Sequence, residues 1–201
     1  MNFDKLFISE DSPYKGKSRR DKFLSRVFGI FNEEIIRIWC DNKNSPFINL
    51  GRPTVYDKDG KHYTLDFLLQ DKDGNTFLTE MKCEIEYQKY KYLTLSKAEQ
   101  LKHHSTKRAF QLFLEIVLNP DLYKIKCNSE LVKVSGSALV WGKVSDIGEK
   151  AVLHEFSLTH VVSTESAVGD LVNWQDPSYI ELIENYELCS QQLFSGLKNG
   201  D

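Results

Sequence analysis

The chain has 201 residues, of which 41% are hydrophobic, 27% charged and 12% aromatic. This composition is typical of a globular protein and excludes a disordered tail, a collagen-like fibre and a disulfide-dense miniprotein. The net charge of -3 is uneven, because residues 145–201 carry -8 and the first 144 residues carry +5. Basic residues concentrate in segments 15–26 and 82–108, and such local positive charge attracts polyanions even in an acidic protein.

Compartment and membrane association are predicted from what the sequence lacks. No apolar run approaches the roughly 20 residues that cross a bilayer, and the first residues have no basic start followed by an apolar core. Cys40, Cys83, Cys127 and Cys189 are scattered without CxxC spacing, which is typical of buried thiols in a reducing compartment. We therefore expect a cytoplasmic protein with no membrane contact, no disulfide framework and no zinc site.

The first half of the chain predicts a helix followed by a β-meander. Residues 18–40 form one apolar stripe at helical spacing, made by Leu24, Val27, Phe28, Phe31, Ile35 and Ile38. Residues 47–85 contain Asp-Lys-Asp-Gly at 57–60 and again at 71–74, each flanked by β-branched and aromatic residues. Asp-Gly between such runs indicates a hairpin turn, so this segment predicts three antiparallel strands.

The second half predicts helices alternating with strands. We expect a helix over 96–118 that begins with a capping box of Ser96 and Glu99 and ends before Asn119-Pro120. Strands are predicted over 137–144 and 154–163, a last helix over 178–194, and a frayed tail over 196–201. The predicted fold class is α/β: a mixed sheet flanked by helices in a single domain, 1–201, with its core over about 18–163.

The register of the predicted hairpins brings charged residues together. If Lys72-Asp73-Gly74 forms a three-residue turn, Asp66 lies directly opposite Glu80, and Lys82 lies on the same face. The same turn geometry in the first hairpin puts Arg52 opposite Asp66. A two-residue turn would instead put Asp66 on the face opposite Glu80 and Lys82, so the arrangement depends on turn length.

Two facing carboxylates predict a bound cation, because they repel each other unless positive charge lies between them. Two carboxylates, a backbone carbonyl and waters suit octahedral Mg²⁺, and Mn²⁺ can take the same ligands. A nearby lysine can orient or deprotonate an attacking water, while the ion polarises a phosphoryl oxygen and stabilises the leaving alkoxide. Asp66, Glu80 and Lys82 are thus the groups required to hydrolyse a phosphodiester.

These residues resemble the signature of the PD-(D/E)xK nuclease superfamily, the restriction-endonuclease-like proteins. Asp66 is followed after 13 residues by Glu80-Met81-Lys82, and the expected helix, three strands, helix and strand over about 18–145 match that family's core. The resemblance implies a Mg²⁺-dependent DNA nuclease in which Asp66, Glu80 and the Met81 carbonyl hold the metal and Lys82 serves the water. Leu65 stands where the motif's nominal proline would be.

The resemblance also implies a glutamate from the first helix. Of the adjacent pair, Glu34 lies nearer the apolar stripe and Glu33 is expected on the solvated side, so Glu34 is the predicted further metal ligand. DNA is the predicted partner, with RNA not excluded and a homodimer left open. Its backbone contacts are expected from Arg52, Lys89, Lys91, Arg19, Arg20, Lys97, His104, Lys107 and Arg108.

Less specific interpretations remain open for each of these groups. Asp66, Glu80, Lys82 and Arg52 could form a solvated cross-strand charge ladder, and Glu34 a salt bridge at the edge of a core helix. The tyrosines interleaved with Lys89 and Lys91 equally suit an edge strand. The alternative function is a non-catalytic nucleic-acid-binding or protein-interaction domain that keeps the nuclease fold with a degenerate site.

Overall fold

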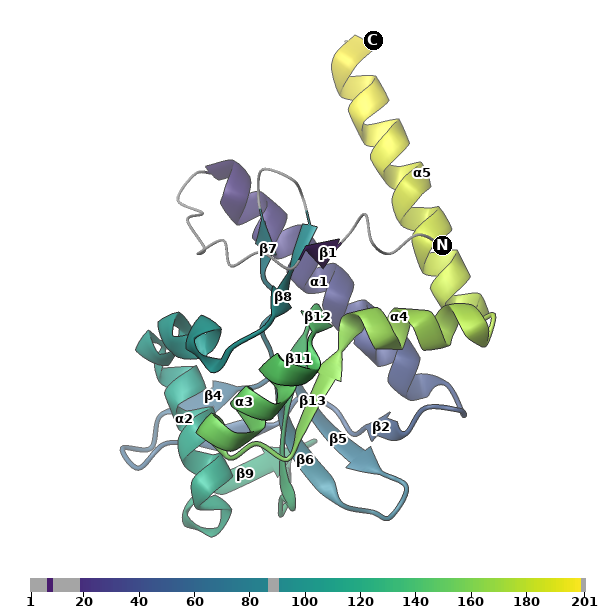
Figure 1. Cartoon of the computed structure of the whole chain (residues 1–201). Helices are drawn as coiled ribbons and strands as arrows, with labels where there is room; N and C mark the ends of the chain where they lie inside the picture. Colours follow the sequence, from purple (N-terminus) through teal and green to yellow (C-terminus); the bar gives the residue numbers. More distant parts are fainter. Residues whose placement is uncertain (1–6, 9–18, 87–90, 200–201) are drawn as a thin grey trace.

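The computed structural model describes residues 7–8, 19–86 and 91–199 (Figure 1). The helices are α1 (Arg19–Asp41), η2 (Ala98–Thr106), α2 (Arg108–Leu118), η3 (Pro120–Leu122), α3 (Asp146–Phe156), α4 (Thr164–Asn173) and α5 (Pro177–Asn199), of which η2 and η3 are 3₁₀ helices. The strands are β1 (Phe7–Ile8), β2 (Phe47–Asn49), β3 (Thr54–Tyr56), β4 (His62–Thr64), β5 (Phe67–Asp71), β6 (Thr76–Met81), β7 (Ile85–Glu86), β8 (Lys91–Leu95), β9 (Lys124–Cys127), β10 (Glu130–Leu131), β11 (Gly136–Trp141), β12 (Lys143–Val144) and β13 (His160–Ser163).

A five-stranded mixed sheet lies at the centre, in the order β13-β11-β6-β5-β2. The pairs β13/β11 and β11/β6 are parallel, whereas β6/β5 and β5/β2 are antiparallel. Two smaller sheets adjoin it, β10-β9-β3-β4 and β1-β8-β12, the latter with β7 paired to β8. The predicted α/β class with a mixed sheet and flanking helices is therefore confirmed.

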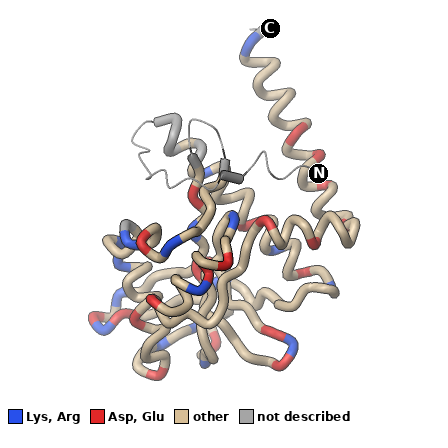
Figure 2. Tube along the Cα trace, viewed as in Figure 1, with Lys and Arg blue, Asp and Glu red and all other residues tan. Residues whose placement is uncertain are grey.

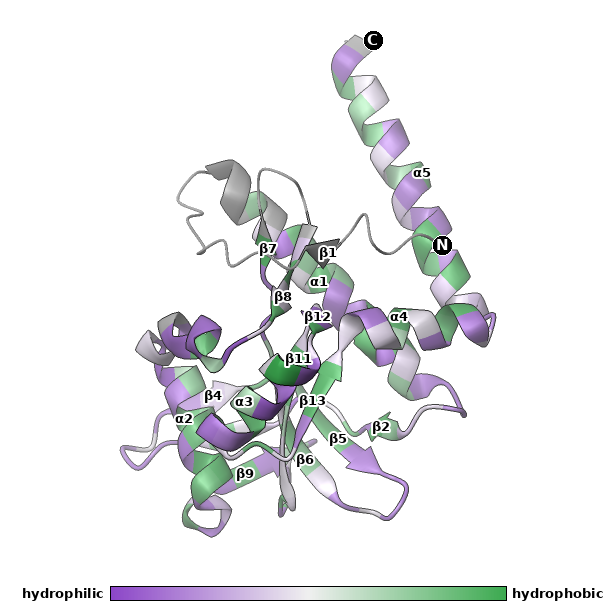
Figure 3. Cartoon of the chain, viewed as in Figure 1, coloured by the Kyte–Doolittle hydropathy of each residue, from purple (hydrophilic) through white to green (hydrophobic). Residues whose placement is uncertain are grey.

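Both faces of the central sheet are covered by helices. On one face, Leu78 and Leu139 pack with Phe113 of α2 and Val152 of α3 in one buried cluster. On the other, Phe67, Met81 and Val140 belong to a second cluster with residues of α1 and α4, including Ile36 and Leu171. The hydropathy colouring shows this apolar character along the central strands (Figure 3). A sheet buried on both faces needs apolar side chains in both directions, so charged residues on it are exceptional.

The two predicted hairpin turns are confirmed, with the three-residue geometry. Asp71 N donates to Asn75 O at 3.0 Å, and Asp57 N donates to Lys61 O at 2.7 Å. Gly74 has φ +87° and Gly60 +83°, the left-handed conformation that glycine adopts without strain. Consequently Phe67 faces Thr79 across β5 and β6, which is the register expected from the sequence.

The predicted three-stranded meander is divided between two sheets. β2 and β3 pair with β5 and β4 in one continuous antiparallel register, but β3/β4 lies in the small sheet and β2/β5 in the central one. The bend falls at Gly51, whose φ is +120°, and at Pro53, which has no N–H to donate. On the opposite strand it falls between β4 and β5, at Leu65 and Asp66. This corner carries Asp66.

The helix predicted over 96–118 is two helices joined at Lys107, which has extended φ and ψ. The predicted capping box is also corrected, because Gln100 rather than Glu99 receives the N–H groups of Ser96 and Lys97, at 2.8 and 3.1 Å. Of the strand predicted over 154–163, only β13 is extended; residues 154–156 complete α3, and residues 157–159 connect the two elements. Neither α3 nor α4 was predicted.

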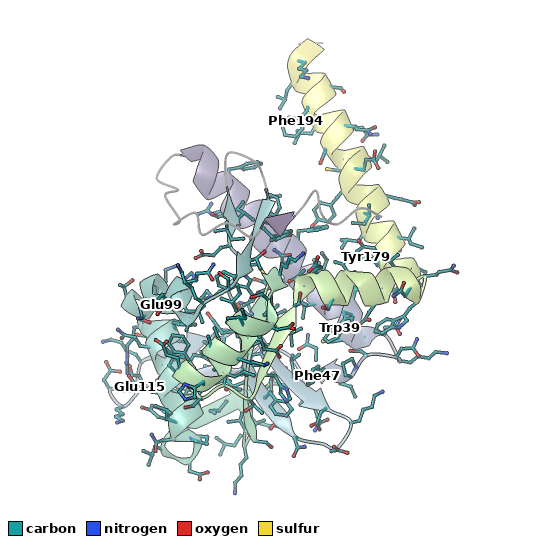
Figure 4. The ribbon with its side chains drawn as sticks, viewed as in Figure 1. Trp39, Phe47, Glu99, Glu115, Tyr179 and Phe194 are labelled. Carbon is teal, nitrogen blue, oxygen red and sulfur yellow. The ribbon has the colours of Figure 1, made fainter. Side chains whose placement is uncertain are left out.

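The last helix is longer than predicted and leaves the body of the molecule. α5 continues to Asn199, so most of the predicted tail over 196–201 is helical. Tyr179 is buried near α1 and α4, whereas Phe194, in the last quarter of α5, is 52% exposed and far from the sheet (Figure 4). Despite the length of α5, none of the described helices has the length and apolarity needed to span a bilayer.

Candidate active site

A cavity of about 400 Å³ opens beside the end of β6, between the first half of α1 and the η2 segment. Its lining comes from α1, from the corner before β5, from the segment that follows β6 and from the end of η2. Those residues are Ser25, Phe28, Gly29, Glu33, Asp66, Met81, Lys82, Cys83, Glu84, Ile85, His104 and Lys107. Polar and charged groups from four distant parts of the sequence thus share one hollow.

Asp66 is fixed at the corner of the bent hairpin. Its Oδ2 accepts a hydrogen bond of 2.8 Å from the backbone N–H of Met81, and its Oδ1 lies 3.6 Å from a guanidinium nitrogen of Arg52. The side chain of Asp66 is 17% exposed, so it faces the cavity without being freely solvated. The structure therefore brings Arg52 and Asp66 together, as the register predicted.

Glu80 lies on β6, and Lys82 is the first residue after the end of that strand. The Lys82 Nζ contacts Glu80 Oε1 and lies 3.1 Å from the Met81 carbonyl oxygen. Burial raises the pKa of Glu80 to about 7; Lys82 opposes this shift and Asp66 adds to it. Lys82 also lies over the ring of Phe110 on α2, 5.8 Å from its centroid. The Lys82 ammonium is thus held by the Glu80 carboxylate and the Met81 carbonyl.

The glutamate that α1 presents to the cavity is Glu33, and the prediction of Glu34 is wrong in this respect. Glu33 Oε2 lies 3.7 Å from Arg52, and its pKa is raised by burial and then by the nearby Asp66. Glu34 instead forms a 2.8 Å ion pair with Arg37 on the same helix, which is the salt bridge considered as its alternative. Its position leaves Glu34 without a role in the cavity.

The far wall of the cavity carries His104, Glu84 and Lys107. His104 Nε2 lies 2.9 Å from Glu84 Oε1, and both side chains are 10% exposed. Burial, followed by Lys82 and Lys107, lowers the pKa of His104 to about 3, so the imidazole is neutral at neutral pH. Cys83 also lines the cavity, but burial raises the pKa of its thiol to about 12, which disfavours a thiolate nucleophile.

The predicted DNA-binding residues are divided. His104 and Lys107 line the cavity, Arg52 contacts the cavity residues Asp66 and Glu33, and Lys97 is exposed where η2 begins. The prediction for Arg108 is corrected: this side chain donates two hydrogen bonds to Asp57, of 2.6 and 2.7 Å, and two to Glu115, of 2.5 and 3.3 Å, so it ties α2 to the β3–β4 turn. Lys89 lies outside the described residues, as do the side chains of Arg19, Arg20 and Lys91.

Sequence reasoning missed Glu33, Glu84 and Phe110 as members of this site. Glu84 follows the Glu80-Met81-Lys82 motif at the spacing of alternate strand residues, a pattern that was available in the sequence. Phe110 was assigned to a deeply packed helix, which it is, at 1% exposed. Its contact with the Lys82 ammonium arises from tertiary packing, and no local pattern indicated it.

The donor set suits a hard divalent cation. Asp66, Glu80 and the Met81 carbonyl supply oxygen ligands, and the Lys82 ammonium already lies against two of these three groups. Within the described residues, no three histidine, cysteine, aspartate or glutamate side chains converge into a complete metal site. Carboxylates from two strands would therefore share the ion with a backbone carbonyl and waters, as Mg²⁺ commonly requires.

Comparison of the chain with protein-family models, with curated proteins and with solved structures gives no match. The geometry of the chain's own residues therefore carries the argument about function.

Proposed function

We propose that this protein is a Mg²⁺-dependent nuclease that hydrolyses DNA phosphodiester bonds by attack of a water molecule. The observation that carries the proposal is that Asp66 and Lys82 line one cavity, while the buried Glu80 contacts Lys82 and lies close enough to Asp66 for that carboxylate to help raise its pKa. The chain order of α1, β2, β5, β6, α2 and β11, with those four strands adjacent in the sheet, agrees with the core that the PD-(D/E)xK resemblance implies.

The proposed roles follow from the position of each side chain. Asp66, Glu80 and the Met81 carbonyl would hold the metal, which would supply Lewis acidity to the phosphoryl oxygen and activate a water molecule. Lys82, which contacts Glu80 and lines the cavity, would orient the attacking water and offset the charge of the phosphate. Arg52, 53% exposed at the rim of the cavity, contacts the phosphate, and Glu33 holds that guanidinium in place.

The second candidate function is a non-catalytic domain that binds nucleic acid or protein. The contact of Lys82 with Glu80 favours it, because the amine then serves permanently as the counter-ion of a buried carboxylate. The two functions differ in a single respect that can be measured: only the enzyme needs the carboxylates to exchange the ammonium for a divalent ion.

DNA cleavage tests the proposal. Supercoiled plasmid and labelled linear duplex are incubated with the full chain and Mg²⁺ or Mn²⁺, with EDTA as the metal-free control. We expect cleavage that needs the ion and falls at least 100-fold in Asp66→Asn and Lys82→Ala, whereas Glu34→Gln cleaves like the wild type. An absence of cleavage under all these conditions, or equal cleavage by Lys82→Ala, would contradict the proposal and favour the binding domain.

A further inference from the structure

We infer that the outer face of the β10-β9-β3-β4 sheet binds the phosphate backbone of DNA and leads it to the cavity. The destination of the strand rests on the proposed nuclease function, but the binding surface is a separate feature of the structure. In Figure 1, β4 and β9 lie beside α2 in the lower left, whereas α5 projects at the upper right. Apart from Arg52, which lies where this face meets the cavity residue Asp66, none of its residues was among the DNA contacts expected from the sequence.

Burial identifies which face of this sheet is open. Val55 and Ile125 are 0% and 2% exposed and point into the core. Since side chains alternate along a strand, their neighbours on β3 and β9 point outward. Lys124 is exposed and Lys126 is half-buried, as expected for this outer face. The two lysines are therefore side by side on one strand, about 7 Å apart along it.

The first row across this face combines a lysine with two rings. Tyr56 pairs with Lys124 on one side and with His62 on the other. The Lys124 Nζ lies 5.1 Å from the centroid of the Tyr56 ring, whose own centroid is 5.9 Å from that of His62. An ammonium beside aromatic faces offers a phosphate contact together with stacking surfaces for bases.

The next rows lead from these lysines to the cavity. Thr54 pairs with both Lys126 and Thr64, which makes the second row. The ladder continues through a 3.0 Å hydrogen bond from Leu65 N to Pro53 O, so Arg52 and Asp66 form the third row. The 3.6 Å contact between those two side chains shows that they meet. A backbone bound along the lysines thus reaches the proposed metal ligand within two rows.

Lys124 and Lys126 are the charged residues on the outer face of β3 and β9, and the acids of the β3–β4 turn beside them are paired. Asp57, at the β3–β4 turn, is neutralised by Arg108, and Asp59 by Lys61 at 2.8 Å. Within the part of the chain that the structure describes, neither Lys124 nor Lys126 forms an ion pair. Unpaired ammonium groups in a row release counterions from DNA when they bind phosphates, which makes the affinity depend on salt.

The test is the salt dependence of DNA binding by Lys124→Ala/Lys126→Ala, measured by fluorescence anisotropy in EDTA so that no cleavage occurs. The probes are one labelled 20-nucleotide strand and its duplex. If each lysine meets one phosphate, the slope of log K against log salt should be shallower by about 1.8 for duplex or about 1.4 for single strand. The affinity at low salt should fall at least tenfold. The form of DNA whose slope changes is the form bound.

Matched variants keep this result interpretable. Lys43→Ala/Lys150→Ala removes the same charge from exposed positions on other elements and should keep the wild-type slope. Lys124→Arg/Lys126→Arg keeps the charge and should also keep the slope, which separates charge loss from misfolding. An unchanged slope in Lys124→Ala/Lys126→Ala, or no DNA binding by the wild type, would overturn the inference. A protein that binds through these lysines without ever cleaving would overturn only the nuclease proposal.

Discussion

The Lys82 ammonium contacts the Glu80 carboxylate and the Met81 carbonyl. Without this cation, the buried carboxylate would have no positive charge beside it. Removal of the counter-ion of a buried carboxylate destabilises the folded protein, because the cost of desolvating the carboxylate is no longer offset. We therefore expect Lys82→Met to lower the free energy of unfolding by about 2–3 kcal/mol in EDTA. Denaturant unfolding measures this loss.

Divalent ions and a second substitution test the cause of that loss. Because an ion can replace the missing ammonium, Mn²⁺ should raise the stability of Lys82→Met more than that of the wild type. The double variant Glu80→Gln/Lys82→Met has no buried charge to compensate and should regain most of the lost stability. If the double variant is as unstable as the single one, lost packing rather than lost charge is responsible.

His104 makes stability depend on pH in a defined direction. Its pKa is about 3 in the folded protein against 6.5 for the free side chain, so below pH 6.5 the unfolded chain binds a proton that the folded chain does not. Stability from this group is present above pH 6.5 and is lost as the pH falls toward 3. Relative to His104→Asn, the wild type should lose about 2 kcal/mol of unfolding free energy between pH 7 and pH 5. A constant difference across that range would show that His104 titrates normally.

Gly29 opens the cavity from the middle of α1. No atom lies within 4 Å of where its Cβ would be, although a helix-interior glycine costs about 0.5–1 kcal/mol relative to alanine. Gly29→Ala should therefore stabilise the protein by about that amount, and Gly29→Phe should fold but block DNA cleavage. Gly169 in α4 is equally unhindered and does not line the cavity, so Gly169→Ala and Gly169→Phe are matched controls. Cleavage retained by Gly29→Phe would contradict the assignment of this cavity to the substrate.

At the scale of elements, the contact of Arg108 with Asp57 joins α2 to the β3–β4 turn. Hydrogen bonds from Arg108 lower the pKa of Asp57 to about 2, so its contribution to stability is present above pH 3.8 and is lost as the pH falls toward 2. Arg108→Met should lower the melting temperature at pH 7 and leave the salt dependence of DNA binding unchanged. Its melting curve at pH 2.5 should approach that of the wild type. A shallower salt slope in this variant would restore Arg108 as a phosphate contact.

The turns show which parts of the fold the sequence predicts. Both Asp-Lys-Asp-Gly turns need a glycine with positive φ, and that local requirement specified turn length, register and hence the encounter of Asp66 with Arg52. The bend at Gly51 and Pro53 was not predicted, because it depends on which core each half of the long hairpin joins. Local chemistry determined the pairing, and tertiary packing determined the direction of the strands.

The phase of α1 shows why one site residue was assigned wrongly. The predicted stripe included Val27, which is 39% exposed, because the first half of the helix extends beyond the core. Ile36 and Trp39, at 0% and 4% exposed, set the buried face instead and were outside that stripe. This rotation of the helix turns Glu33 rather than Glu34 toward Asp66. The error came from weighting all apolar residues of a long helix equally.

At the scale of the whole molecule, acidic and basic residues are distributed over different regions. Figure 2 shows acidic residues along the first half of α5 and a basic residue near its end, away from the sheets. The negative charge of the C-terminal region is therefore carried partly by a helix that projects from the body. Lys124 and Lys126 of the β10-β9-β3-β4 surface belong to the basic first part of the sequence, whereas the cavity combines the acids Glu33, Asp66 and Glu84 with the bases Lys82 and Lys107.

The proposed nuclease function depends on whether Asp66 and Glu80 bind a divalent ion together. Isothermal titration of Mn²⁺ into the metal-free full chain measures this directly, without requiring a substrate. We expect saturable binding by the wild type and by Glu34→Gln, and its loss in Asp66→Asn and in Glu80→Gln. No binding by the wild type, or equal binding by all four proteins, would contradict the proposed metal site and the nuclease built on it.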